Sequence, residues 1–128
     1  MIRRVFHRVR RHTISFQNAF SGLWYAYSTQ PNFAVHTIVA ILAIFLGWRL
    51  AIGETEWLIL TFTIVLVFVA EMINTALESI CDLVTQEWRQ SAKIAKDISA
   101  AMVLVVAIGA VVVGLVIFGK YIMLILNS

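Results

Sequence analysis

Three long apolar runs constrain what this chain can fold into more than any other feature of its sequence. They cover residues 33–52, 57–84 and 98–126, and each meets the requirement of about twenty apolar residues for a membrane-spanning helix. Hydrophobic residues make up 61% of the 128 residues and charged residues 13%, a balance far from that of a soluble domain. The sequence therefore predicts an all-α membrane protein with three transmembrane helices.

The segment before the first span combines a basic arm with an amphipathic helix. Five arginines lie in the first twelve residues, and no acid appears before Glu54. Residues 13–29 place apolar side chains at spacings of three and four opposite polar ones, so this helix should lie in the membrane interface. We expect residues 1–31 to form this arm and surface helix within a single domain, 1–128. Because no soluble domain follows, we expect the basic charge to bind a membrane surface, and we expect no nucleic-acid partner.

The two loops between the spans predict the orientation. The loop at 53–56 is short and acidic, whereas the stretch at 85–97 carries three basic residues. Under the positive-inside rule, the N-terminus and the second loop lie in the cytoplasm, and the C-terminus lies outside.

A stripe of polar residues interrupts the second span. Helical spacing puts four side chains within an arc of about 80°: Glu71, Asn74, Glu78 and Asp82. Glu71 lies about 21 Å along the helix from Trp57 at its outer end, which places it in the inner leaflet. Because one charge at mid-bilayer costs about 2.5–3.5 kcal/mol, these side chains should face protein, water or a cation.

Two interpretations of this stripe stay open from the residues alone. A helix end that leaves the membrane with a solvated acidic face explains Asp82 but explains Glu71 poorly. Alternatively, clustered carboxylates form a site for Mg²⁺, which takes one or two carboxylates together with phosphate oxygens. Lys96 begins the third span on the same membrane face and can hold a phosphate. Glu71 can then accept a proton from a lipid hydroxyl, which indicates phosphoryl transfer from ATP.

The pattern Glu71-x-x-Asn74-x-x-x-Glu78-x-x-x-Asp82, followed by Ala95-Lys96-Asp97, resembles a known motif. It is similar to that of the prokaryotic diacylglycerol kinase and undecaprenol kinase family of small membrane kinases. The resemblance runs from about Arg11 into the third span. It implies a lipid kinase that uses ATP and Mg²⁺, is a homotrimer with active sites between subunits, and spans the bacterial cytoplasmic (inner) membrane several times.

The resemblance also implies roles for individual residues. Glu71 would be the general base, and Glu78 would be a Mg²⁺ ligand. The nucleotide-binding residues would be Arg11, Asn74, Asp82, Glu87, Arg89, Lys96 and Asp97. For Arg11, binding of anionic lipids is the alternative explanation.

The chain departs from the family just before the first span. Where the family usually carries a glutamate that completes the metal site, this chain has Gln30, in Thr29-Gln30-Pro31-Asn32-Phe33. The amide still offers an oxygen ligand but removes one negative charge. Weaker Mg²⁺ binding, an altered nucleotide geometry or lost activity are all consistent with this change.

Substrate choice rests on the stretch Asn32-Phe33-x-x-His36. It resembles the undecaprenol kinase branch more than the diacylglycerol kinase branch, so Asn32 and His36 are candidate lipid-binding residues and undecaprenol is favoured over diacylglycerol. His36 has a simpler explanation as a satisfied polar residue between helices. Two other functions stay open: a kinase-like protein impaired by Gln30, and a small cation or proton transporter, since intramembrane acids often mark such routes.

Overall fold

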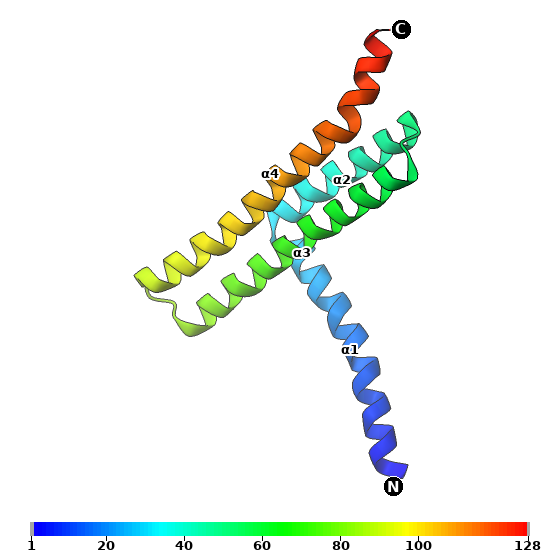
Figure 1. Cartoon of the computed structure of the whole chain (residues 1–128). Coiled ribbons are helices and arrows are strands. Elements are labelled where there is room, and N and C mark those ends of the chain that lie inside the picture. Colours follow the sequence, from blue (N-terminus) through cyan, green and yellow to red (C-terminus); the bar gives the residue numbers. More distant parts are fainter. Residues whose placement is uncertain (1, 128) are drawn as a thin grey trace.

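A computed structural model describes residues 2–127 of the chain, with side chains from residue 16 onward. These residues form four α-helices and no strand: α1 (Ile2–Thr29), α2 (Pro31–Leu50), α3 (Glu54–Val84) and α4 (Gln90–Leu126). α3 and α4 lie antiparallel and side by side, α2 packs beside them, and α1 leaves this bundle at a steep angle (Figure 1). The predicted all-α class is confirmed.

Three of the helices are long and apolar enough to cross a membrane. The most apolar stretches of α2, α3 and α4 have mean hydropathies of 1.9, 2.1 and 3.1. Many large apolar side chains of α4 point outward, and Val105, Leu115 and Val116 are 69–70% exposed in the single chain. Outward apolar side chains of this kind are expected where lipid replaces water as the solvent. The three predicted spans therefore correspond to α2, α3 and α4.

The helices do not begin and end where the predicted spans do. α4 starts at Gln90, well before the predicted residue 98, because a hydropathy pattern marks the membrane-embedded part of a helix and misses its polar end. α3 starts at Glu54 instead of residue 57. α2 runs from Pro31 to Leu50 instead of 33–52, and it ends because Ala51 adopts a left-handed conformation (φ 50°).

Pro31 causes the break between α1 and α2. A proline restricts the residue before it to extended conformations, and Gln30 has φ −106° and ψ 110°. The Gln30 N–H still donates to the Ala26 carbonyl at 3.0 Å, while its own carbonyl accepts from the Phe33 N–H at 3.1 Å. The chain therefore changes direction at Gln30 without leaving the backbone groups of this residue unpaired.

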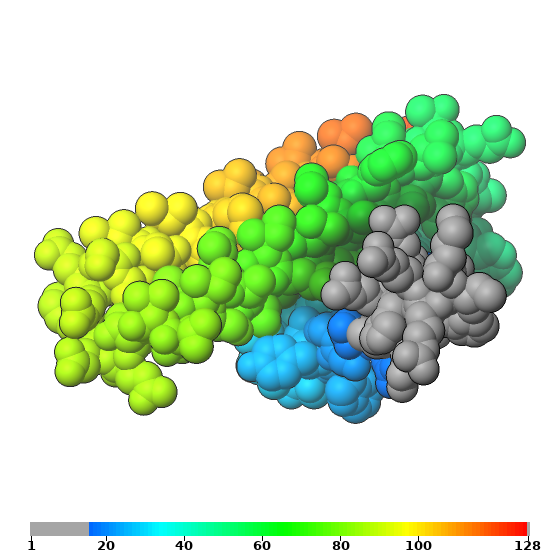
Figure 2. All heavy atoms as spheres, turned by 90° about the horizontal axis from the view of Figure 1, so that it is seen from below, coloured from blue at the N-terminus to red at the C-terminus, as the bar shows by residue number. Residues whose placement is uncertain are grey.

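The part of α1 with described side chains is amphipathic, as expected. Phe16, Phe20 and Trp24 follow one another at intervals of four and are 69–74% exposed. A helix with such an aromatic face fits the membrane interface. Figure 2 shows this part of α1, in blue, gathered against the middle of the bundle, while the α3–α4 turn extends beyond it.

A cluster of polar contacts fastens α3 to α4 near the α2–α3 loop. Glu56 accepts hydrogen bonds from the Gly53 N–H at 2.9 Å and from the Tyr121 hydroxyl at 2.6 Å. The same carboxylate forms an ion pair with Lys120. Ile52, Leu60 and Ile117 form a buried apolar cluster, and Tyr121 packs against it. These contacts set the register in which α4 runs back along α3.

Gly47 allows the close approach of α2 to α3, and a larger residue there should destabilise the bundle. An added Cβ would lie 3.0 Å from Ile52 Cδ1 and 3.1 Å from Trp57 Cη2. We expect Gly47→Leu to lower the free energy of unfolding by about 1–3 kcal/mol through overpacking. Gly109→Leu is the control, because a Cβ at Gly109 meets nothing within 4 Å. Thermal unfolding in detergent measures both, and equal stability of the two variants contradicts this prediction.

Candidate active site

The polar stripe of α3 runs from the buried interior of the bundle to its exposed end. Glu71 is fully buried and Asn74 is 4% exposed. Glu78 is half-buried, and the side chain of Asp82 is 65% exposed. The segment 71–82 belongs to the half of α3 that leads to the α3–α4 turn (Figure 1). The stripe therefore runs from buried to exposed positions, and the burial of its first two members distinguishes it from a solvated helix end.

Glu71 is an unusual group because its carboxyl is buried without hydrogen-bond partners. Neither Oε1 nor Oε2 has a partner among the described residues. His36 from α2 places Nε2 4.0 Å from Glu71 Oε2, and the side chain of Asn32, one turn earlier on α2, also approaches this carboxyl. Leaving a buried acceptor unsatisfied is costly. The two carboxyl oxygens of Glu71 are therefore available to a molecule that binds at this site.

Asn74 is held in place by a bond across the helix pair. The Ser99 hydroxyl of α4 lies 2.7 Å from Asn74 Oδ1 and 2.9 Å from the carbonyl oxygen of Lys96. The Asn74 amide donates to Glu78 Oε1 at 3.2 Å. We call Asn74, Glu78 and Ser99 the amide cluster. It fixes the orientation of Glu78, which was the predicted metal ligand.

Ser99 was not among the residues singled out from the sequence. The available signal was its spacing: it follows Lys96 by three positions, so the two side chains share a face of α4. Serine in an apolar helix is common, however, and only the packing of α4 on α3 shows that this hydroxyl meets Asn74.

Removing the Ser99 hydroxyl should destabilise the pairing of α3 and α4. Ser99 is 2% exposed, so Ser99→Ala leaves Asn74 Oδ1 buried without its donor. We expect a loss of about 1–3 kcal/mol in the free energy of unfolding. Ser91→Ala, at an exposed position of the same helix, should have little effect. Equal unfolding midpoints for the two variants in detergent would show that the bond contributes nothing.

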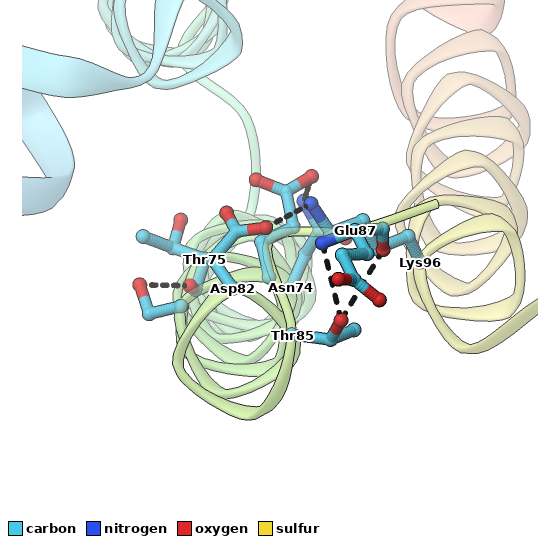
Figure 3. A network of polar contacts seen from close by, with 8 residues as sticks. Asn74, Thr75, Asp82, Thr85, Glu87 and Lys96 are labelled. Atoms are coloured by element: carbon cyan, nitrogen blue, oxygen red, sulfur yellow. Dashed lines mark hydrogen bonds and ion pairs between the residues drawn. The ribbon is translucent and has the colours of Figure 1, made fainter. Parts of the chain in front are cut away.

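The exposed end of the stripe borders a polar groove between α3 and α4. Lys96 Nζ donates to Asp82 Oδ1 at 2.6 Å, and Figure 3 shows Lys96 reaching from α4 toward α3. The groove has a volume of about 480 Å³, within the range of small-molecule sites. Its lining includes five of the predicted nucleotide-binding residues: Asp82, Glu87, Arg89, Lys96 and Asp97.

The turn that closes this polar groove is organised by Thr85. The Thr85 hydroxyl accepts from the Glu87 N–H at 3.1 Å and lies 3.3 Å from the Glu87 carbonyl oxygen. Arg89 Nη2 lies 3.7 Å from Glu87 Oε2, and both side chains are exposed. Asp97 forms an ion pair with Lys93 one turn away on α4. These charged groups all line the polar groove.

Two predicted site residues, Gln30 and Arg11, lie apart from these contacts or outside what the structure describes. Gln30 is half-buried at the α1–α2 break, and no polar contact among the described residues joins it to Glu78. Asn32 is exposed in the first turn of α2, and its side chain approaches Glu71. The side chain of Arg11 lies outside the described part of the chain.

The donor set fits a magnesium ion that is completed by phosphate oxygens. Within the part of the chain that the structure describes, no three His, Cys, Asp or Glu side chains converge as a preformed metal cage. Mg²⁺ seldom requires one, since it is usually bound through one or two carboxylates and substrate phosphates. Glu78 supplies a carboxylate of this kind, and Asn74, which orients it, supplies an amide oxygen.

Comparison with known proteins identifies similar chains. A family model described as prokaryotic diacylglycerol kinase matches residues 17–118. A diacylglycerol kinase of Synechocystis sp. is 43% identical over 102 residues, which cover 79% of this chain and 58% of that relative. An undecaprenol kinase of Bacillus subtilis is 36% identical over 104 residues, covering 81% and 85%. A diacylglycerol kinase of Escherichia coli is 27% identical over 94 residues, covering 73% and 77%. The match thus spans little more than half the length of the cyanobacterial relative.

Proposed function

Because this chain belongs to the prokaryotic diacylglycerol kinase family, we propose that it transfers the γ-phosphoryl group of ATP to the hydroxyl of a membrane lipid alcohol. The observation that carries the proposal is the buried carboxyl of Glu71, whose two oxygens have no partner among the described residues. Its position, between the apolar interior and the polar groove, is where a lipid hydroxyl can meet a phosphate.

The proposed reaction assigns one task to each part of the stripe. Glu71 accepts the proton of the lipid hydroxyl as the hydroxyl oxygen bonds to the γ-phosphorus. The bond from that phosphorus to the β–γ bridging oxygen breaks, and ADP leaves. Lys96 binds the phosphates as a cation on the groove wall. Asp82 in turn positions Lys96.

Glu78 and Asn74 are the residues proposed to hold Mg²⁺ together with ATP. When bound, the ion neutralises charge on the phosphate oxygens. The Asn74–Glu78 hydrogen bond and the Ser99–Asn74 bond hold these ligands on one face of α3. Arg11, Glu87, Arg89 and Asp97 remain proposed nucleotide contacts.

For the substrate, we propose undecaprenol first and diacylglycerol second. The relatives include proteins named diacylglycerol kinase and one named undecaprenol kinase, so similarity to them excludes neither alcohol as the substrate. The stretch Asn32-Phe33-x-x-His36 supports undecaprenol, and its His36 approaches Glu71.

We further propose a homotrimer in the bacterial inner membrane, with the α3–α4 turn and the N-terminus in the cytoplasm. The incomplete burial of the second half of the stripe supports an assembly with active sites between subunits. In the single chain, Glu78 is half-buried and Asp82 is exposed, so further protein or a bound nucleotide has room to complete the site.

A direct assay tests the proposed function. The full chain in phospholipid vesicles is given labelled ATP, Mg²⁺ and either undecaprenol or a diacylglycerol. We expect phosphate transfer to at least one alcohol, more rapidly to undecaprenol, and its loss when Mg²⁺ is chelated. A folded protein that phosphorylates neither alcohol refutes the kinase proposal, and ion flux across the vesicles without ATP would favour a transporter.

Changing Gln30 to glutamate should strengthen metal binding. The variant restores the negative charge that the family usually carries before the first span, and we expect half-maximal activity at a roughly tenfold lower Mg²⁺ concentration. Gln17→Glu adds the same charge at an exposed position of α1 and should leave the Mg²⁺ dependence unchanged. An identical Mg²⁺ titration for both variants removes Gln30 from the metal site.

A further inference from the structure

Each round of the reaction proposed above leaves a proton on the Glu71 carboxyl, which is closed off from solvent in the single chain. Glu71 is fully buried, and neither of its oxygens has a hydrogen-bond partner among the described residues. A carboxyl in this position cannot pass its proton directly to water. Because the next round requires an ionised base, the proton has to leave through a neighbouring group that can accept it.

His36 of α2 is a neighbour that can accept this proton. Its Nε2 lies 4.0 Å from Glu71 Oε2, a contact between two different helices. A neutral imidazole has one nitrogen with a free lone pair, and histidine is the side chain that gains and loses a proton near neutral pH. The separation is about 1 Å longer than a hydrogen bond, a gap that rotation of either side chain closes.

The other polar groups that act on Glu71 are poor proton acceptors. Glu78, two turns further along α3, also acts electrostatically on the Glu71 carboxyl. It accepts a hydrogen bond from Asn74 and is the proposed Mg²⁺ ligand, a role for which it has to stay ionised. Asn32 approaches Glu71 as well, but a neutral amide does not take up a proton at neutral pH. His36 is therefore left as the acceptor.

His36 also has the exposure that Glu71 lacks. Its side chain is 18% exposed, against 0% for Glu71. Asn32 lies one turn earlier on the same side of α2 and is exposed where the helix begins. Under the proposed topology, this end of α2 faces the cytoplasm, where water is available. Asn32 and His36 thus form a polar edge that leads from the buried carboxyl toward the surface of the bundle.

Aromatic packing holds His36 close to Glu71. Phe33, three positions before His36, is 5% exposed, and its ring centroid lies 4.9 Å from that of Phe68. Phe68 in turn precedes Glu71 by three positions on α3. Residues three apart are neighbours on a helix surface, so this ring pair sets the separation of α2 and α3 next to the histidine and the carboxyl. The approach of the imidazole to the carboxyl is therefore fixed by helix packing.

We propose that His36 removes the proton from Glu71 after each phosphoryl transfer and so returns the base to its ionised form. This inference rests on the proposed function. The O–H bond of Glu71 breaks and leaves its electron pair on the carboxylate oxygen, while the lone pair of His36 Nε2 forms the new N–H bond. The imidazolium then gives a proton to water on the Asn32 side. His36 acts through Glu71, which distinguishes this role from a contact with the lipid itself.

Comparing the first turnover with later ones tests this role. His36→Gln keeps a polar side chain but cannot carry the proton. We expect it to phosphorylate one lipid per site at nearly the wild-type rate, after which steady-state turnover is about 10²-fold slower than in the wild type. Rapid-quench measurements on the full chain in phospholipid vesicles with labelled ATP give both rates. Thr37→Val is the control, because the Thr37 hydroxyl donates within its own helix, to the Phe33 carbonyl at 2.8 Å.

Three results for His36→Gln beside an active wild type overturn this inference and leave the proposed function standing. Normal steady-state turnover means that the proton leaves by another route. Equal slowing of the first and later turnovers means that His36 has a structural role. A raised KM for the lipid with unchanged kcat means that His36 binds the substrate. An inactive wild-type protein, in contrast, overturns the proposed function and this inference with it.

A second variant and a spectroscopic measurement give signatures that a structural role would not produce. In His36→Ala, imidazole added to the buffer should raise steady-state turnover at least about tenfold and leave the first turnover unchanged. In His36→Gln, infrared difference spectra should show the carbonyl band of a protonated carboxyl that accumulates after the first turnover and is absent without ATP. Slow turnover without this band, or no rescue by imidazole, overturns the proposal.

Discussion

Replacing Glu71 by glutamine is expected to abolish lipid phosphorylation while leaving ATP binding close to that of the wild type. Glutamine keeps the size of the side chain but cannot accept the proton of the lipid hydroxyl. General bases contribute factors of this order, so we expect kcat to fall by about 10³-fold. ATP binding should survive, because the polar groove that holds Lys96 and Asp82 lies beyond Glu71 toward the α3–α4 turn.

The matched control for this variant is Glu54→Gln. Glu54 is an exposed acid in the first turn of α3, so the substitution is chemically identical and far along the same helix. Initial rates with saturating lipid and ATP give kcat, and equilibrium binding of a fluorescent nucleotide gives affinity. A Glu71→Gln protein that retains most of its activity would show that another group takes the proton. Loss of nucleotide binding along with activity would point to a misfolded variant, which thermal unfolding detects.

Replacing Lys96 by methionine is expected to have the second largest effect. Methionine retains the apolar stem but removes the cation that lines the polar groove. Positioned charges on a transferring phosphoryl group contribute strongly to its stabilisation, so we expect kcat/KM for ATP to fall by about 10²-fold. Stability should change little, because the Lys96–Asp82 pair is solvent-exposed and such pairs contribute weakly to folding.

Lys93→Met provides the comparison, since Lys93 lies one turn earlier on α4 and pairs with Asp97 instead. We expect a distinctly smaller loss of activity from it. Asp82→Asn tests the positioning of Lys96: if Asp82 acts through Lys96, the double variant should be no worse than Lys96→Met alone. Equal losses for Lys93→Met and Lys96→Met would mean that the general positive charge of the groove matters and the specific position does not.

The stripe could be read from the sequence because helical geometry is local. The spacing of Glu71, Asn74, Glu78 and Asp82 places them on one face of any regular helix, and the apolar residues before them set their depth in a bilayer. The structure adds the burial of Glu71 and Asn74 against the other helices. Helix bounds were predicted less well, because the polar first turns of α3 and α4 carry no hydropathy signal.

Contacts between helices could not be predicted in the same way. The Ser99–Asn74 bond joins residues 25 positions apart, and the Tyr121–Glu56 bond joins residues 65 positions apart. Neither pair shares a periodicity or a motif. Both depend on the register in which α4 returns along α3, and the side-chain packing of the finished bundle decides that register.

By itself, the sequence determined that the chain is helical, that three of its helices suit a membrane, and that a polar stripe lies on one of them. These properties follow from composition and from the period of a single helix. Only the tertiary structure decided that His36 approaches Glu71 and that Ser99 orients the amide cluster. Each of these requires side chains from different helices to meet, and a pattern within one helix carries no information on how it packs against another.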